Sequence, residues 1–341
     1  MNKIYITAIK QISAQQPLVD DWFEQPDFYS EPYVRAIDPD YKQFFTSNEA
    51  RRWGKILKRA LLVSRQVRSE SGVLQPDAII TGTGLGCIEN TEIFLDKLVR
   101  EGEELLNPTH FMQSTHNTIG SLIAIDAKCH AYNSTYAHNG ISFECALQDA
   151  FLQLKNNTIQ TALVGAHDEM TPDYFTLLKK AGYLGKPNQT FAGETAVAMM
   201  LSTEKPEKAW CEIEAVEKLY CDLSQIENRM PHIANLDYIM IGTNGEPEND
   251  KIYFENCKKL FPDIPLLQYK NIFGEGYSAP ALGVYAAALC LQKGEIPDFL
   301  ICDMRYATQN SRISHIANQK SKILFYNHFE GKNHSFILLS T

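Results

Sequence analysis

The chain has 341 residues and a formal net charge of −9, with 44% hydrophobic and 21% charged residues. This length suffices for two core-sized units or one large fused domain. The acidic balance argues against a nucleic-acid-binding surface, which needs clustered Lys and Arg. No apolar run approaches the roughly 18 residues of a membrane span, so we expect neither a nucleic acid nor a membrane as a partner.

The eight cysteines form no C-x-x-C pair, and most of them sit in apolar runs. Cysteines scattered in this way are typical of buried thiols in a reducing compartment. The first nine residues, MNKIYITAI, have the pattern of a strand rather than of a signal peptide. We therefore expect a cytoplasmic protein.

Short β-branched runs alternate with longer helical patterns along the chain, which favours a layered α/β fold. The predicted strands are Lys3–Ile9, Ala78–Thr81, Thr161–Gly165, Ala196–Ser202, Tyr238–Ile241, Phe299–Asp303 and Ser335–Leu339. The predicted helices are Glu49–Ser69, Asn90–Glu101, Gly140–Lys155, Gly283–Lys293 and a shorter one after Asp250.

The order of elements in the first half returns in the second half. Each half begins with a strand that ends in a Gly-Thr turn, and a variable stretch follows. Then come an alanine-bearing helix, a strand, and a final hydrophobic strand that ends in Leu-Ser. The matched segments are Asp77–Thr83 with Asp237–Thr243, Ser142–Leu154 with Gly283–Gln292, Ala162–Ala166 with Phe299–Asp303, and Met200–Ser202 with Leu338–Ser340. This order predicts a duplicated α/β unit, residues 1–205 and 206–341, in one compact body. Two unrelated α/β domains are the alternative.

Five local motifs, in order along the chain, resemble those of the β-ketoacyl synthases. They are the opening strand Ile4–Ile9, the turn Ile80–Gly86, the loop Asn107–Met112 with His116–Gly120, the segment Gly193–Ala196, and a C-terminal stretch with Phe329, Gly331 and Asn333. The chain is therefore similar to this family of thiolase-like condensing enzymes over essentially its whole length. The resemblance implies a thiolase-like layered αβαβα fold with two pseudo-repeated halves. The chain is shorter than typical members, and the stretch Gly185–Phe191 is reduced.

At the three catalytic positions this sequence departs from the family. Within Thr135–Gly140, Tyr136 aligns with the nucleophilic Cys. Gly242 aligns with the first catalytic His, on a frame set by Pro247, Asn249 and Asp250, and Glu275 aligns with the second His, on a frame set by Lys270 and Gly274. The positions of Cys, His and His are thus taken by Tyr, Gly and Glu.

These residues are poorly suited to decarboxylative condensation. A phenol with a pKa of about 10 stays protonated at neutral pH and carries acyl groups poorly. Glycine offers no donor to a developing enolate, and an ionised Glu275 would repel it. A neutral Glu275 would need a strongly raised pKa, and Cys145 is better interpreted as buried filler inside the next helix. We assign no catalytic residue and expect no condensation by this chain alone.

The resemblance also implies residues that line an acyl tunnel or a subunit interface. For Phe111 and Phe329 an ordinary core position is the alternative, and Tyr136 is interpreted as a plug in an inherited pocket. The candidates are Phe111, Met112, His116, Tyr136, His138 and Phe329.

Three further groups of residues have alternative functional interpretations. Tyr136, His138 and Glu275 could form a new acid–base set. His116 and His138 have no further ligand at metal-binding spacing, so we expect no metal and no cofactor. Gly82–Gly86 lacks both the dinucleotide fingerprint and a following Lys-Ser/Thr, which favours a tight turn over a phosphate loop.

The resemblance is closest to non-catalytic, chain-length-factor-like subunits, and the loop at His116–Gly120 looks most like those of aryl-polyene or flexirubin-type pigment clusters. It implies a heterodimer with a catalytic synthase in fatty acid, polyketide or polyene biosynthesis, with acyl carrier protein as a further partner. An enzyme with altered acyl-transfer or acid–base chemistry and a homodimeric acyl-binding scaffold are the two alternatives.

Overall fold

A computed structural model describes residues 2–51, 53–104, 106, 108–221, 235–302, 314–315 and 321–341. Asn107, the first residue of one family-like loop, and Asp303, the last residue of one predicted strand, lie outside these ranges. No described helix is both long and apolar enough to cross a membrane.

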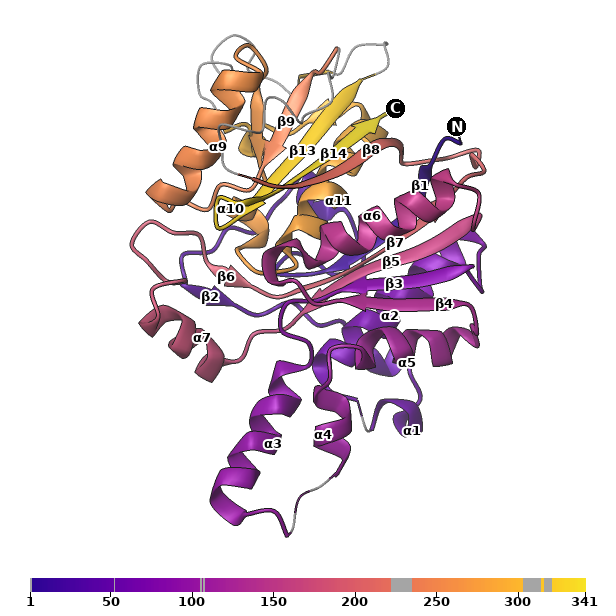
Figure 1. Cartoon of the computed structure of the whole chain (residues 1–341), viewed down its shortest axis with the longest axis vertical. Helices are drawn as coiled ribbons and strands as arrows, with labels where there is room; N and C mark the ends of the chain where they lie inside the picture. Colours follow the sequence, from indigo (N-terminus) through magenta and orange to yellow (C-terminus); the bar gives the residue numbers. More distant parts are fainter. Residues whose placement is uncertain are drawn as a thin grey trace.

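One ten-stranded mixed sheet forms the framework of the molecule (Figure 1). The strand order is β10-β9-β13-β14-β8-β1-β7-β5-β3-β4. In chain order these strands are β1 (Tyr5–Ile12), β3 (Ala78–Gly82), β4 (Tyr132–Tyr136), β5 (Thr161–Asp168), β7 (Thr195–Ser202), β8 (Cys211–Tyr220), β9 (Tyr238–Ile241), β10 (Leu266–Gln268), β13 (Lys322–Phe329) and β14 (Asn333–Ser340). Two short pairs lie outside it, β2 (Tyr33–Val34) with β6 (Ala192–Gly193) and β11 (Glu295–Ile296) with β12 (Ser314–His315).

The two halves of the sheet repeat one arrangement of strands. In the first half β3 lies parallel between β4 and β5, and in the second half β9 lies parallel between β10 and β13. Antiparallel strands follow in each half, β7 and β1 in the first and β14 and β8 in the second. The halves join where Tyr5 and Ile6 of β1 pair with Glu212 and Cys211 of β8.

Helices lie outside and between the two halves. The helices are α1 (Ser47–Ala50), α2 (Lys55–Ser71), α3 (Ile88–Glu101), α4 (Pro108–Ser114), α5 (Thr118–Ala127), α6 (Ser142–Lys155), α7 (Pro172–Lys180), α9 (Pro247–Leu260), α10 (Lys270–Phe273) and α11 (Ala279–Lys293). α2 and α5 pack on the outer face of the first half, and α9 packs on that of the second. α6 and α11 contact strands of both halves, so the layers run helix, sheet, helix, sheet, helix.

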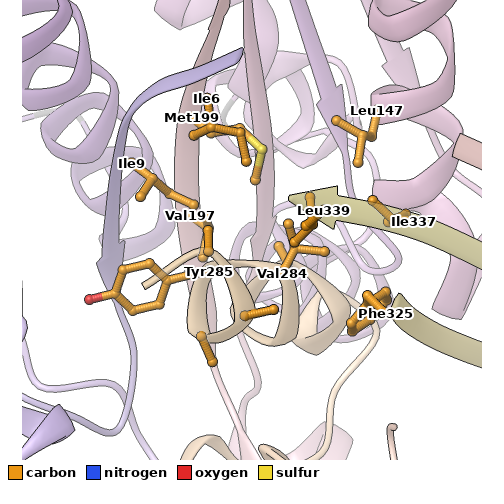
Figure 2. Close-up of a cluster of buried hydrophobic side chains, with 14 of the residues drawn as sticks. Ile6, Ile9, Leu147, Val197, Met199, Val284, Tyr285, Phe325, Ile337 and Leu339 are labelled. Atoms are coloured by element: carbon orange, nitrogen blue, oxygen red, sulfur yellow. The ribbon is translucent and has the colours of Figure 1, made fainter. Parts of the chain in front are cut away.

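The largest hydrophobic cluster of described residues surrounds α11, and Figure 2 shows part of it. Every residue from Ala279 to Leu291 is buried, because this segment is apolar on all sides and therefore fits between the two halves of the sheet. Val284 and Tyr285 of α11 lie among side chains of the surrounding strands, including Met199 and Phe325. Gly283 allows the close approach, since a Cβ there would lie 2.4 Å from Phe325 Cε2.

Some predicted elements differ from the observed ones. The segment predicted as the strand Phe299–Asp303 begins instead with a 3-10 helix, Asp298–Leu300, and pairs with β10 only through a bridge from Ile301 to Leu267. Pro297 precedes this helix, and its fixed φ and missing N–H suit a helix start better than a strand. The second-half counterpart of β5 is β13, which we did not predict. The single helix expected at Glu49–Ser69 is two helices, because Gly54 with an extended backbone is the N-cap of α2.

Candidate functional site

A cavity of about 510 Å³ opens between the two halves at the head of α6. Its walls come from α7 and the loop that follows it, from the segments after β9 and β10, and from the end of β13. The residues that line it are Asn139, Gly140, Met170, Tyr174, Leu178, Gly182, Tyr183, Leu184, Lys186, Gln189, Asn244, Glu246, Asn249, Lys270, Glu275, Gly276, Tyr277, Pro280, Asn327, His328, Phe329 and Glu330. Of the predicted site residues, Glu275 and Phe329 lie here.

Asn139 and Gly140 bring the chain from β4 into the head of α6. They begin a 3-10 turn, Asn139–Ile141, and Asn139 has a left-handed φ of 49°. The ring of Phe329 packs on Gly140 so closely that a Cβ there would lie 2.5 Å from Phe329 Cδ2. The head of the helix therefore presents backbone, and no nucleophilic side chain, to the cavity.

Tyr136 does not line this cavity, which differs from its predicted place as a plug. It ends β4 and packs on the main core beside Cys145 and Asp149 of α6. Burial and then Asp149 raise the pKa of its phenol to about 12. The physical reason is spacing: Ala137 and His138 follow β4 before the chain reaches the cavity at Asn139.

Gly242 lies beside a buried polar network rather than in the cavity wall. A Cβ at Gly242 would lie 2.5 Å from the Tyr253 hydroxyl, which donates to Asn327 Oδ1 at 2.9 Å. Asn327 in turn donates to Glu144 Oε1 at 2.7 Å. Burial raises the pKa of Glu144 to about 7. The tyrosine thus fills the space beside Gly242 and continues hydrogen bonding down to a carboxyl in α6.

Glu275 is held in an ion pair at the cavity wall. Lys270 Nζ lies 2.8 Å from Glu275 Oε2, and Asn244 Nδ2 donates to the same oxygen at 2.7 Å. The backbone of Glu275 is fixed as well, because its N–H donates to Phe191 and its carbonyl accepts from Gly193. Oε2 accepts from both neighbours, so this oxygen does not act as a hydrogen-bond donor in this arrangement.

His328 is a cavity residue that the sequence analysis missed. Its Nε2 lies 3.1 Å from the carbonyl of Asn249, and its ring centroid lies 4.2 Å from that of Tyr253. Burial lowers its pKa to about 3, so the ring is neutral at physiological pH. Its place directly before Phe329, a residue that the motif had already singled out, is the signal that could have found it.

The remaining predicted residues lie on the surface. Phe111 and Met112 belong to α4, which forms an arm with α3 that projects from the body of the molecule (Figure 1). Their exposed fractions are 56% and 69%. His116 and His138 are exposed too. The cavity therefore gathers Glu275 but neither Tyr136 nor His138, and the acid–base set of these three is not assembled.

The turn after β3 holds a carboxylate of the chain itself. Asp168 accepts hydrogen bonds from the backbone of Gly84 and Leu85, from Thr83 Oγ1 at 2.7 Å, and from Ser278 Oγ at 2.5 Å. The donors that a phosphate would need are thus already used, in agreement with a tight turn. Among the described residues, no group of three or more His, Cys, Asp or Glu could hold a metal ion.

The comparisons with known proteins agree with this architecture. Residues 29–245 match the family described as the β-ketoacyl synthase N-terminal domain. No curated protein matches the chain. The structure of the ishigamide ketosynthase/chain length factor has a TM-score of 0.81 and 15% identity, covering 100% of this chain and 99% of that one.

Two further solved structures are similar over nearly their full length. The ketosynthase ApeO in complex with its chain length factor ApeC, from Xenorhabdus doucetiae, gives a TM-score of 0.78 at 14% identity, covering 100% of this chain and 98% of that one. A β-ketoacyl synthase from Burkholderia phymatum STM815 gives 0.77 at 11% identity, covering 100% and 99%. The predicted thiolase-like fold is confirmed.

Proposed function

The chain belongs to the β-ketoacyl synthase family, and we propose that it acts as a chain-length-factor-like partner of a catalytic synthase rather than as a condensing enzyme. The observation that carries this proposal is the head of α6, where Gly140 offers the cavity no nucleophile. In condensing enzymes of the family a Cys stands at the start of this buried helix. We infer that Gly140, and not Tyr136, occupies its place.

The other groups around the cavity support the same conclusion. Cys145, the nearest thiol along α6, lies 3.0 Å from Lys218 Nζ, and burial raises its pKa. Such a thiol has little of the thiolate that acyl transfer needs. Neutral His328 donates to a backbone carbonyl, and Lys270 is paired with Glu275. The two histidines that polarise a thioester in the family have no counterparts in this set.

The outer surface of the first half supports a partner subunit. β4 is the last strand of the sheet, and an edge strand offers unpaired backbone groups to another chain. Beyond α5, which packs against β4, the arm of α3 and α4 exposes large apolar side chains, among them Val99, which is 84% exposed, together with Phe111 and Met112. Exposed apolar clusters of this kind mark protein interfaces. We propose this arm and β4 as the surface that contacts the synthase.

Co-expression with a Cys-containing synthase encoded beside this chain tests the proposal. We expect a stable one-to-one complex by light scattering, and product from malonyl-carrier protein only when both chains are present. Met112→Asp should weaken the complex at least about tenfold, because it places a charge at a desolvated contact. Phe254→Asp, at an exposed apolar residue on α9 in the second half, is the matched control.

Two outcomes would contradict this function. Turnover by the pure chain, abolished by substitution of His328 or Glu275, would instead indicate an enzyme with altered chemistry. A stable homodimer that retains acyl ligands and ignores the synthase would indicate a scaffold. Similar structures that contain a ketosynthase with its chain length factor make the heterodimer the first arrangement to test.

A further inference from the structure

The sequence contains two Asn-Gly pairs, Asn139-Gly140 and Asn244-Gly245. In such a pair the backbone nitrogen of the glycine can attack the side-chain carbonyl carbon of the asparagine, which closes a five-membered ring. Glycine favours this attack, because it has no Cβ to crowd the approach and its backbone rotates easily. In a folded chain the reaction depends on the contacts that hold the amide and the nitrogen in place.

Few contacts hold Asn139-Gly140. Asn139 is exposed in the cavity wall, and no described residue forms a hydrogen bond with its side-chain amide. The N–H of Gly140 precedes the first hydrogen bond of the 3-10 turn, which joins the N–H of Ile141 to the carbonyl of His138 at 3.2 Å. The carbonyl of Asn139 accepts from Ser142 Oγ at 2.8 Å. Attack therefore needs only a local opening of one exposed turn.

The second pair, Asn244-Gly245, is fixed by several hydrogen bonds. Asn244 is buried, its Nδ2 donates to Glu275 Oε2 at 2.7 Å, and its Oδ1 accepts from the N–H of Glu246 at 3.0 Å. The N–H of Gly245 donates to Asp250 Oδ2 at 2.9 Å, so a carboxylate holds the attacking nitrogen. Attack here would break all three bonds, and the two that involve carboxylates are stronger than neutral ones.

A third asparagine separates the effect of glycine from the effect of exposure. Asn188 is exposed as well, and its φ of 66° lies in the same left-handed region as the φ of 49° at Asn139. Gln189 follows it, and the Cβ of this residue crowds the backbone nitrogen. Asn188 thus differs from Asn139 in the residue that follows, and Asn244 differs from Asn139 in burial and hydrogen bonding.

We propose that Asn139-Gly140 is a site of spontaneous deamidation. The nitrogen of Gly140 gives up its proton and bonds to Cγ of Asn139, the C–N bond of the side-chain amide breaks, and the amide nitrogen leaves as ammonia. The resulting succinimide takes up one water and opens to aspartate or to isoaspartate. Overall one water is consumed and one ammonia is released. The site does not depend on the partner proposed above.

The product changes the charge of the cavity. Both aspartate and isoaspartate carry a carboxylate where Asn139 is neutral. Two ion pairs already lie in the wall, Lys186 with Glu246 and Lys270 with Glu275. These lysines are paired, so they leave the added negative charge uncompensated. An aged chain therefore presents a more negative cavity than a freshly made one.

Ageing the purified full chain at pH 8 and 37 °C, followed by peptide mass spectrometry, tests the site. Conversion at Asn139 should be at least about tenfold faster than at Asn244, since the latter must break more hydrogen bonds, and also faster than at Asn188. Isoaspartate, detected with protein isoaspartate methyltransferase, should accompany aspartate at residue 139. The rate should fall at pH 6, because the attacking nitrogen must lose a proton. Equal rates at the three asparagines, aspartate without isoaspartate, or no conversion at Asn139 overturns the proposal.

Asn139→Gln lengthens the side chain, so that attack would have to close a larger ring, and it should abolish the isoaspartate signal. Asn188→Gln, at the other exposed asparagine, is the matched control and should leave the signal unchanged. A signal that survives Asn139→Gln contradicts the proposal. Should that variant fail to fold, Gly140→Ala decides: its methyl group should slow conversion at Asn139, and an unchanged rate rejects attack by this nitrogen.

Discussion

The central helices α6 and α11 hold equivalent places in the two halves, but they bury different side chains. α11 is apolar throughout its buried length. α6 carries Glu144 inward, where it meets Asn327 and Ser335 of the second half. α11 thus packs the core almost entirely with apolar side chains, with the Tyr285 hydroxyl accepting from Trp22 Nε1, while α6 supports a buried carboxyl in a polar network that reaches the wall of the cavity.

The largest expected effect tests the packing of α11. Gly283→Ala places a methyl group 2.4 Å from Phe325 Cε2 and 2.7 Å from Tyr269 Cε1, and both rings are fully buried. We expect a loss of about 3 kcal/mol in the free energy of unfolding, after the gain in helix propensity is subtracted. Chemical denaturation measures it. A neutral or stabilising result would mean that α11 is not tightly packed.

The second prediction concerns the pH dependence of stability that the buried carboxyl of Glu144 in α6 causes. The pKa of Glu144 is raised to about 7 in the folded chain from an ordinary 4.5. The unfolded chain therefore loses this proton first, and the stability of the fold falls as pH rises from about 4.5 to about 7 and then levels off. Relative to the wild type, Glu144→Gln should gain about 2 kcal/mol between pH 5 and pH 8. Parallel stability curves for the two proteins would refute this titration.

The smallest expected loss of stability comes from the same type of substitution at the turn before α6. Gly140→Ala also creates a short contact, but here with Phe329, which is only partly buried and borders the cavity. The ring can move into that space, so we expect a loss below about 1 kcal/mol. The same substitution thus costs much within α11 and little in the 3-10 turn that precedes α6. Equal losses in thermal and chemical unfolding would remove the distinction between the two helices.

The elements that the sequence predicts best are those whose pattern depends on burial alone. β9 lies at Tyr238–Ile241 as expected, and α11 is plain from its apolar run. β4 was missed because its sequence YNSTY is polar, as suits an edge strand. β8 was missed although CEIEAVEKLY begins with the alternation of a half-buried strand.

The site was harder to predict than the fold, because it depends on the path of the chain between elements. Alignment with the family motif predicts Tyr136 at the pocket. In the structure, the turn at Asn139 brings Gly140 to the cavity instead. Lys270 was used as a marker for alignment, and its pairing with Glu275 needed the structure. Phe329, which the C-terminal motif singled out, lies in the cavity wall, although the strand that it ends, β13, was not predicted.

The contact between Asp168 and Ser278 has a consequence for dissecting this protein. The carboxylate comes from the first half and the hydroxyl from the second, and Gly84 of the adjoining turn lies against the ring of Tyr277. A fragment that ends near residue 205 would leave Asp168 without one of its donors and would uncover the face on which α11 packs. We therefore expect that neither half can be produced alone as a soluble, stably folded polypeptide, and that binding studies require the intact chain.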